Sequence, residues 1–159
     1  FLKKFKSKGI LIVIDSRSLT LEDIIELKPW LIKPNQEEIS EYLSKNISDF
    51  DSTVKAATQI HKNGIENVMI SLGEKGAVLV NTDGIFTAVP PEIDAISTIG
   101  AGDSTIAGFI SATIQNKCSS EKLKTAVSFG TAACLTGGTK PPTSKNVQKI
   151  FDQIKVDKI

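Results

Sequence analysis

The sequence predicts an α/β layered fold built around a mixed sheet. The segment ILIVID, at 10–15, is a continuous apolar run that stops at Asp15; its length is typical of a strand buried on both faces of a parallel sheet. Helix-like segments follow this run, and three strand-like segments separated by short turns containing Gly or Asp come next. A chain of 159 residues with 40% hydrophobic content is long enough for one compact unit with its own core.

Capping residues and prolines set the first boundaries. Gly9 is expected to cap the end of an opening helix, because glycine readily adopts the left-handed backbone found there. Thr20, with Asp23 three residues later, predicts a helix N-terminus, and Pro29 ends that helix.

Similar signals divide the rest of the chain. Asp51 or Ser52 is expected to cap one helix at its start, and Gly64 to cap its end. From Gly102 onward, apolar spacing predicts helices only. After the opening helix, the expected elements are strands at 10–15 and 30–35, helices at 19–29, 36–46 and 49–64, strands at 67–73, 76–82 and 84–90, and helices at 103–117, 119–138 and 144–156.

Charge and composition argue against several classes of protein. Lys and Arg total 19 against 18 Asp and Glu, so the net charge of +1 gives no field that would attract nucleic acid or an anionic membrane. The longest apolar run, at 10–14, is far shorter than the roughly 20 residues that span a bilayer. We therefore expect neither nucleic-acid nor membrane partners. Cys118 and Cys134 lie in no metal-binding pattern, so we expect both to be buried free thiols in a reducing cytoplasm.

The stretch STIGAGDSTIAGF, at 97–109, carries the strongest chemical signal. Gly100, Ala101 and Gly102 leave backbone amides uncovered at a helix N-terminus, where unpaired donors and the helix dipole favour an anion such as a phosphate. Asp103 would repel that anion unless it accepts a proton from an attacking hydroxyl, which is the division of labour in a kinase. The alternative is a tight turn followed by an acid that stabilises the helix dipole.

A second candidate is KPNQEE, at 33–38. Asn35 follows a predicted strand and Glu38 lies in the first turn of the next helix, so both can point into one cleft and hold water around Mg²⁺. Lys33 can meet a phosphate. The alternative is an Asn N-cap with an acidic first turn.

Two weaker signals come from small residues. Gly73 and Gly76 would let a ligand approach the backbone, but they also suit an ordinary hairpin turn. The run from Gly130 to Ala133 thins one helix face, which could seat an adenine ring or simply allow close helix packing.

His61, the sole histidine, is expected on the surface. No GxSxG, HExxH or P-loop pattern occurs in the sequence.

Together these stretches resemble the ribokinase/phosphofructokinase-B family of sugar kinases. The stretch at 97–109 is similar to the family's C-terminal signature, and KPNQEE and SLGEKG precede it in the family's order. Sequence segments such as IKPNQEEIS and GTAACLTGGT look most similar to the sugar-phosphate branch of the family. This branch comprises 6-phosphofructokinase of the minor type, 1-phosphofructokinase and tagatose-6-phosphate kinase. The resemblance implies a three-layer ribokinase-like sandwich, mostly parallel with helices on both faces. Residues 1–159 would be its C-terminal nucleotide-binding and catalytic portion.

The resemblance also implies a role for each matching residue. Asp103 would be the catalytic base, and Gly100, Ala101 and Gly102 would form the anion hole for the transferred γ-phosphoryl group of ATP. Lys33 and Asn35 would contact ATP phosphates, and Asn35 and Glu38 would organise Mg²⁺. The remaining nucleotide-site residues would be Ser71, Gly73, Gly76, Val127, Gly130 and Thr131, and a monovalent cation such as K⁺ would lie near Ser97, Ile99, Ala133 and Gly138.

This chain departs from the family in two ways. The residues after the first strand are DSRSL, so Arg17 replaces the small residues of the usual Asp-Ser/Thr-Ser-Gly turn, and the role of Asp15 is left open. About the first half of the family's chain is absent, with its sugar-binding residues and its lid. We therefore expect this segment alone to have little or no kinase activity and to bind nucleotide weakly, and the full-length enzyme to be a homodimer.

The expected function is ATP-dependent phosphorylation of a hydroxyl on a sugar phosphate, either fructose 1-phosphate or fructose 6-phosphate. One alternative keeps the family and changes the acceptor to tagatose 6-phosphate, a nucleoside, a hydroxymethylpyrimidine or an unphosphorylated sugar. Another is a non-catalytic nucleotide-binding module, in which Asp103 only stabilises a helix.

Overall fold

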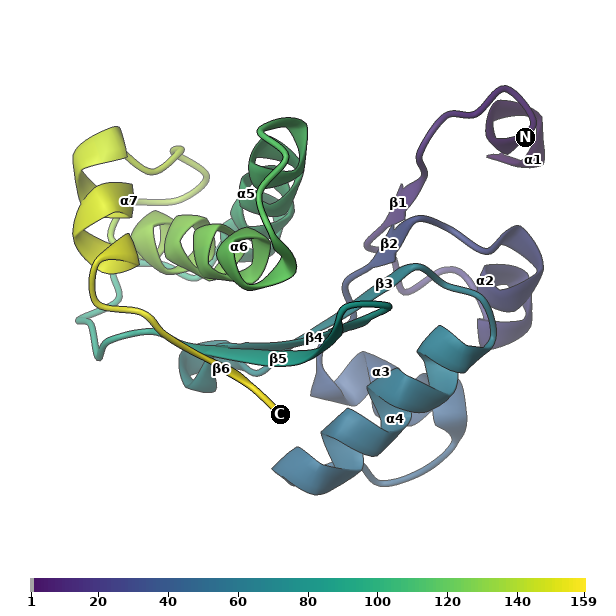
Figure 1. Cartoon of the computed structure of the whole chain (residues 1–159). Coiled ribbons are helices and arrows are strands. Elements are labelled where there is room, and N and C mark those ends of the chain that lie inside the picture. The colour runs from purple at the N-terminus through teal and green to yellow at the C-terminus, as the bar shows by residue number, and fades with distance from the viewer. Residues whose placement is uncertain (1) are drawn as a thin grey trace. The chain divides into compact units, whose positions relative to one another are not determined.

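The computed structural model describes residues 2–159 and has an α/β fold, as expected (Figure 1). Six strands form one sheet in the order β1-β2-β3-β4-β5-β6. The chain divides into two compact units, which are described separately below. Unit 1 extends to Leu72 and includes Val78–Ile85, and unit 2 comprises Gly73–Ala77 and Phe86–Ile159.

Strands and helices alternate in the first part of the chain, and helices dominate the last part. The helices are α1 (Leu2–Lys6), α2 (Leu21–Leu27), α3 (Gln36–Leu43), α4 (Phe50–Lys62), α5 (Ala101–Ile114), α6 (Ser119–Ala133) and α7 (Ser144–Phe151), with a short 3₁₀ helix at Gly73–Lys75. The strands are β1 (Val13–Ile14), β2 (Leu31–Ile32), β3 (Asn67–Ser71), β4 (Ala77–Asn81), β5 (Gly84–Val89) and β6 (Lys155–Lys158). No helix within residues 2–159 is long and apolar enough to cross a membrane.

The sheet is mixed, which confirms the predicted class. β1, β2 and β3 are parallel, with Ile14 opposite Ile32 and Ile32 opposite Val68. β5 and β6 are antiparallel, with Phe86 opposite Lys158. Both residues of β2 are buried, and so are the first four residues of β3, as expected for strands inside a parallel sheet.

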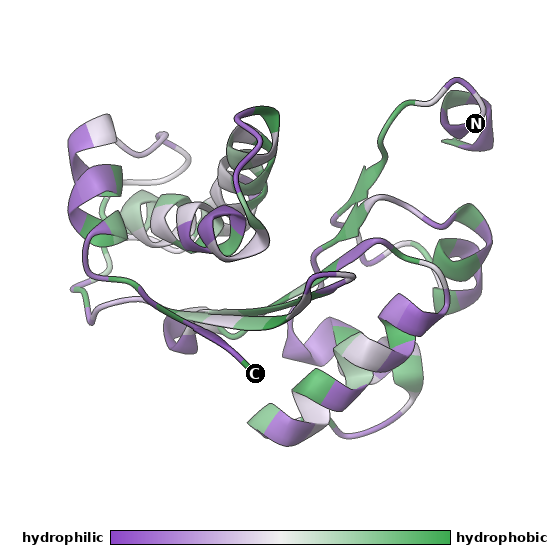
Figure 2. Cartoon of the chain, in the orientation of Figure 1, coloured by the Kyte–Doolittle hydropathy of each residue, from purple (hydrophilic) through white to green (hydrophobic). Residues whose placement is uncertain are grey.

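The core of unit 1 lies between its strands and the apolar faces of α2, α3 and α4. Ile24, Ile39 and Ile60 come one from each helix, and all are fully buried with Val68 and Ile70 of β3. Figure 2 shows that apolar and polar residues alternate along α4, as expected for a helix with one buried face.

Side-chain caps define the helix starts in unit 1. Thr20 and Asp23 form the expected reciprocal capping box, with the Asp23 amide donating to Thr20 Oγ1 at 3.2 Å. The prediction for α4 is wrong by two or three residues: its N-cap is Asp49, whose carboxylate accepts from the Ser52 amide at 2.8 Å. This hydrogen bond is the main reason that the pKa of Asp49 is lowered.

Two helices form the core of unit 2. α5 buries Phe109, and α6 buries Leu123 and Ala126. A Cβ atom on Gly108 would lie only 2.8 Å from the carbonyl oxygen of Thr125 and 3.0 Å from the Cα atom of Ala126, so α5 and α6 approach closely there. The absence of a side chain at Gly108 therefore allows α5 and α6 to pack closely.

Several expectations about elements and burial are wrong. The first strand has two residues rather than six, because Ile10 and Leu11 are 48% and 61% exposed and precede the pairing with β2. The segment after α7 turns back as β6, since pairing with β5 overrides its helical apolar spacing. Cys118 is exposed rather than buried.

Two other side chains are intermediate in exposure. Cys134 is a free thiol, as expected, but it is only partly buried, and this burial raises its pKa. His61 is half-buried rather than on the open surface, and its Nδ1 lies 2.8 Å from the carbonyl oxygen of Ile65, at the turn after α4.

Candidate functional site

Four polar residues of unit 1 lie at the carboxyl ends of its three parallel strands. Because Ile14 is opposite Ile32, the next residues along β1 and β2, Asp15 and Lys33, also lie side by side. Asn35 forms an isolated parallel bridge with Ser71, at the end of β3. Ligands bind at this edge in open α/β sheets.

Lys33 is the cation of this group, and its side chain is buried. Its side chain is 7% exposed, and its Nζ atom lies 3.3 Å from Oδ2 of Asp15, whose side chain is 28% exposed. A buried ammonium needs such a partner to offset its lost hydration. Sequence reasoning left the role of Asp15 open, and the strand register is the signal that would have paired it with Lys33.

Asn35 and Glu38 form a capping box at the start of α3, as the alternative interpretation of KPNQEE predicts. The Glu38 amide donates to Asn35 Oδ1 at 2.8 Å, and the Asn35 amide donates to Glu38 Oε2 at 2.9 Å. This cap fixes the Glu38 carboxylate beside the strand ends, so structural and functional interpretations of this motif are compatible.

The other oxygen of Glu38 binds Arg17, which sequence analysis singled out only as a departure from the family. Arg17 Nε donates to Glu38 Oε1 at 2.8 Å, and one terminal nitrogen of Arg17 lies 3.8 Å from Glu37 Oε2. The hydrogen bond and charge of Glu38 raise the pKa of Arg17. Both carboxylate oxygens of Glu38 are thus engaged.

Tyr42 packs into the same region of unit 1. Its hydroxyl donates to the carbonyl oxygen of Ser16 at 2.8 Å. Burial, together with the negative charges of Glu38 and Asp15, raises the pKa of Tyr42 above the usual 10.0. The hydroxyl is therefore a neutral donor that holds the loop carrying Arg17.

The residues fit a magnesium ion that is shared with phosphates and water. No group of three or more His, Cys, Asp or Glu residues that could hold a metal occurs within residues 2–159. Magnesium often needs only one or two carboxylates when phosphates complete its shell. The Glu38 carboxylate, 12% exposed, already holds a positive group, the Arg17 guanidinium, so its position suits a cation.

The glycines of SLGEKG have different surroundings. Gly76 has φ +91°, and a Cβ atom there would lie 1.8 Å from the carbonyl oxygen of Ala88, so close backbone contact within unit 2 requires glycine. Gly73, with φ +61°, has nothing within 4 Å of its Cβ position, and its carbonyl oxygen accepts from the Gly76 amide at 3.1 Å.

The glycine-rich stretch of unit 2 leads into α5. Gly100 has φ 80° and the Ser104 amide donates to its carbonyl oxygen, which places Gly100 at the N-cap. The Ala101 amide donates to the carbonyl oxygen of Thr98 at 3.2 Å, so this amide, a predicted member of the anion hole, already has an acceptor within the chain. The amides of Gly102 and Asp103 belong to the first turn, where no preceding helical carbonyl can accept from them. Asp103 is exposed.

The predicted adenine-border residues lie along α6. Gly130 is buried, and a Cβ atom there would lie 2.1 Å from Thr105 Oγ1 of α5. Packing therefore explains this glycine without a ligand. Val127 is 5% exposed and Thr131 is intermediate, so Thr131 is the more accessible of the two.

The residues predicted around a monovalent cation lie on two neighbouring segments of unit 2. The amides of Ile96 and Ser97 donate to the carbonyl oxygen of Cys134 at 2.8 and 3.3 Å. A Cβ atom on Gly100 would lie 3.9 Å from the Cα atom of Thr139. The segment before α5 therefore lies beside the segment after α6.

One of these residues has its carbonyl already engaged. The Ala133 oxygen accepts from both the amide and the hydroxyl of Thr136, at 3.0 and 2.8 Å. Ile99 and Gly138 are exposed. A cation at Ala133 would have to replace a hydrogen bond, so the predicted cation site finds least support there.

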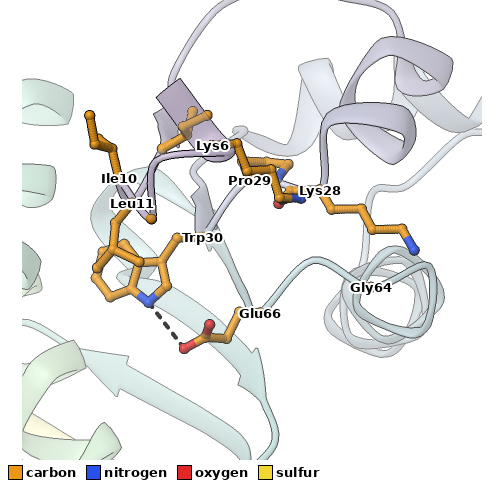
Figure 3. A pocket seen from close by; sticks show the side chains of 10 residues that line it. Lys6, Ile10, Leu11, Lys28, Pro29, Trp30, Gly64 and Glu66 are labelled. Atoms are coloured by element: carbon orange, nitrogen blue, oxygen red, sulfur yellow. Dashed lines mark hydrogen bonds between the residues drawn. The ribbon is translucent and has the colours of Figure 1, made fainter. Parts of the chain in front are cut away.

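A cavity in unit 1 is lined by none of the candidate site residues that the sequence predicts (Figure 3). It has a volume of about 320 Å³, and Leu11 and Trp30 are among the residues that line it. Trp30 Nε1 donates to Glu66 Oε1 at 3.1 Å. A second cavity, of about 260 Å³, lies in unit 2 between the segment at 91–94 and α7.

Comparison with known proteins gives a consistent family. Residues 2–146 match the model of the family described as "pfkB family carbohydrate kinase". The chain is 33% identical to a 1-phosphofructokinase of Borreliella burgdorferi over 154 residues, which cover 96% of this chain and 50% of the relative. It is 34% identical to a tagatose-6-phosphate kinase of Staphylococcus epidermidis, covering 95% of this chain and 50% of the relative.

Solved structures give the same result. Phosphofructokinase-2 from Escherichia coli superposes with a TM-score of 0.88 at 30% identity, covering 95% of this chain and 50% of that chain. A ribokinase from Thermotoga maritima, at 21% identity and a TM-score of 0.79, shares the fold. The chain spans about half the length of the relatives just described.

Proposed function

This chain belongs to the pfkB family of carbohydrate kinases, and we propose that it supplies the nucleotide site and the catalytic base for ATP-dependent phosphorylation of a sugar phosphate. The acceptor is fructose 1-phosphate or fructose 6-phosphate, with tagatose 6-phosphate as the alternative. Relatives named for fructose-phosphate and tagatose-6-phosphate kinases support this acceptor class.

The start of α5 carries this proposal. Gly100 turns the chain in a left-handed conformation, and the amides of Gly102 and Asp103 then point from the first turn without helical acceptors. Such donors, together with the helix dipole, stabilise the negative charge of a transferred phosphoryl group. Asp103 takes the proton of the attacking hydroxyl as the new P–O bond forms, while the bond from the γ-phosphorus to the bridging oxygen of ATP breaks and ADP leaves.

Unit 1 contributes positive charge and fixed donors. Lys33 attracts a nucleotide phosphate with its ammonium, and Asp15 keeps that ammonium oriented at the strand edge. Magnesium, when bound with the nucleotide, neutralises phosphate charge. Asn35 and Glu38 hold its water shell, because their capping box fixes both side chains.

A second candidate is a nucleotide-binding module without catalysis. It is favoured by the exposure of Asp103 and by the engaged amide of Ala101. In that case the carboxylate would only stabilise the dipole of α5.

The test has two arms. Calorimetry measures ATP binding to the 159-residue chain, and a kinase assay presents fructose 1-phosphate, fructose 6-phosphate and tagatose 6-phosphate to the full natural gene product that carries this sequence. We expect weak ATP binding, little turnover by the 159-residue chain, and turnover of one sugar phosphate by the gene product. ATP binding with no turnover of any sugar phosphate would favour the module, and no ATP binding would contradict both candidates.

A further inference from the structure

Arg17, the sole arginine of the chain, lies in the loop that follows the carboxyl end of β1. The proposed function places the nucleotide phosphates at this edge of the sheet. Asp15, two residues earlier in the same loop, lies 3.3 Å from the Lys33 ammonium, which the proposed function assigns to a phosphate. The loop that holds Lys33 in place therefore also carries a second positive side chain.

The protein engages only one side of the Arg17 guanidinium. Its Nε atom donates to Glu38 Oε1 at 2.8 Å. One terminal nitrogen lies 3.8 Å from Glu37 Oε2, which is too far for a hydrogen bond, and the Glu37 side chain is 82% exposed, so this contact adds little. Among the residues that the structure describes, 2–159, the N–H groups of the two terminal nitrogens thus have no hydrogen-bond acceptor.

Glu38 is a fixed anchor for this side chain. Its carboxylate is 12% exposed, and its second oxygen accepts from the Asn35 amide at 2.9 Å in the capping box of α3. The backbone before Arg17 is held as well, because the Tyr42 hydroxyl donates to the carbonyl oxygen of Ser16 at 2.8 Å. These contacts restrict Arg17 before any ligand binds, which lowers the entropy that its side chain would lose on binding.

The terminal N–H groups of a guanidinium suit a phosphate. They form a planar fork that can donate two parallel hydrogen bonds to phosphate oxygens. Both ATP and the sugar phosphate carry such oxygens. The nucleotide is favoured, because Asp15 joins the loop of Arg17 to Lys33, the residue assigned to the nucleotide.

We propose that Arg17 is a second cationic contact for the phosphates of the bound nucleotide, oriented by Glu38 and donating from its terminal nitrogens. The inference rests on the proposed function, which places the nucleotide at this edge. Glu38 keeps both of its hydrogen bonds and its place beside the water shell of magnesium, because the phosphate meets other N–H groups. Arg17 is 63% exposed, so loss of this contact should weaken ATP binding only about threefold to tenfold.

The matched variants are Arg17→Gln and Lys45→Gln. Both remove one positive charge from unit 1, but Lys45 lies beyond the end of α3 and is exposed. Calorimetry measures the binding of ATP, and of adenosine, which has no phosphate, to the full natural gene product that carries this sequence. We expect Arg17→Gln to bind ATP about threefold to tenfold more weakly than the wild type and adenosine equally well, and Lys45→Gln to match the wild type with both. Unchanged ATP binding by Arg17→Gln, or an equal loss for ATP and adenosine, would overturn the proposal.

Two further arms test the charge and the source of the phosphate. Arg17→Lys keeps the positive charge without the planar fork, so it should recover part of the ATP affinity that Arg17→Gln loses, and no recovery would overturn the proposal. Fructose 1-phosphate and fructose 6-phosphate should bind Arg17→Gln as they bind the wild type. Weaker binding of a sugar phosphate with unchanged ATP binding would assign Arg17 to the acceptor and overturn the proposal.

The outcome for the wild type separates this inference from the proposed function. If the wild type binds ATP and Arg17→Gln binds it equally well, only the inference fails. If the wild type binds no ATP, the proposed function fails and the inference fails with it.

Discussion

Replacement of Gly130 by alanine tests whether packing, rather than a ligand, requires the small residue in α6. The new Cβ atom would lie 2.1 Å from Thr105 Oγ1 and 3.2 Å from the carbonyl oxygen of Ala101. Ordinary contact begins at about 3.5 Å, so the first distance is a severe overlap and the second a mild one. Thr105 must rotate, which breaks the 2.8 Å hydrogen bond from its hydroxyl to Ala101.

The magnitude follows from two opposing effects. Overpacking of this kind costs about 1 to 3 kcal/mol. Alanine is favoured over glycine in a helix by about 1 kcal/mol, which offsets part of that cost. The free energy of unfolding of Gly130→Ala should therefore fall by about 0 to 2 kcal/mol, as measured by urea denaturation followed by circular dichroism.

Repeating Gly130→Ala in a Thr105→Ala background tests whether the overlap with Thr105 causes the loss of stability. It removes the hydroxyl that overlaps the new methyl group, so Gly130→Ala should there be neutral or stabilising by up to about 1 kcal/mol. Gly137→Ala is the control, because Gly137 has nothing within 4 Å of its Cβ position. Equal destabilisation by Gly130→Ala in both backgrounds would refute the reasoning, since the cost could not then come from Thr105.

Three further predictions concern stability and pH. Thr20→Ala removes the acceptor for the Asp23 amide and should lower the free energy of unfolding by about 1 kcal/mol in thermal denaturation, and no loss would contradict the cap. Phe109→Ala deletes a fully buried ring and should cost about 3 to 5 kcal/mol in urea denaturation, whereas a loss below about 1 kcal/mol would place Phe109 outside the core. Tyr42, the sole tyrosine, has a raised pKa in the folded chain because of burial, so its stabilising effect is present below about pH 10 and is lost as the pH rises through the folded pKa. Ultraviolet titration should find it above 10.0, and a midpoint at or below that value would contradict its burial.

The sequence predicted local features of the fold well. The Thr20 and Asp23 cap, and the start of α3 at Asn35, depend on residues three apart, so their chemistry is visible in the sequence. β6 was missed because pairing with β5 joins residues about 70 positions apart, and apolar spacing carries no such information. Long-range pairing also limits β1, since only Val13 and Ile14 meet β2.

The candidate site was predicted in part for the same reason. Lys33 and Glu38 could be singled out from one motif, but their partners could not. Asp15 meets Lys33 through strand register, and Arg17 meets Glu38 across 21 residues of sequence. Gly130 shows the opposite case, because the sequence left packing and adenine binding open and the distance to Thr105 explains it by packing.

Asp103→Asn in the full natural gene product tests the central claim most directly. The substitution keeps the size of the side chain and removes its ability to accept a proton. If Asp103 is the base, kcat for the sugar phosphate falls by about 10² to 10⁴ while the Kd for ATP, measured by calorimetry, stays nearly unchanged. Nearly normal turnover together with a lower free energy of unfolding would contradict the account, and would leave Asp103 as an acid that stabilises only the start of α5.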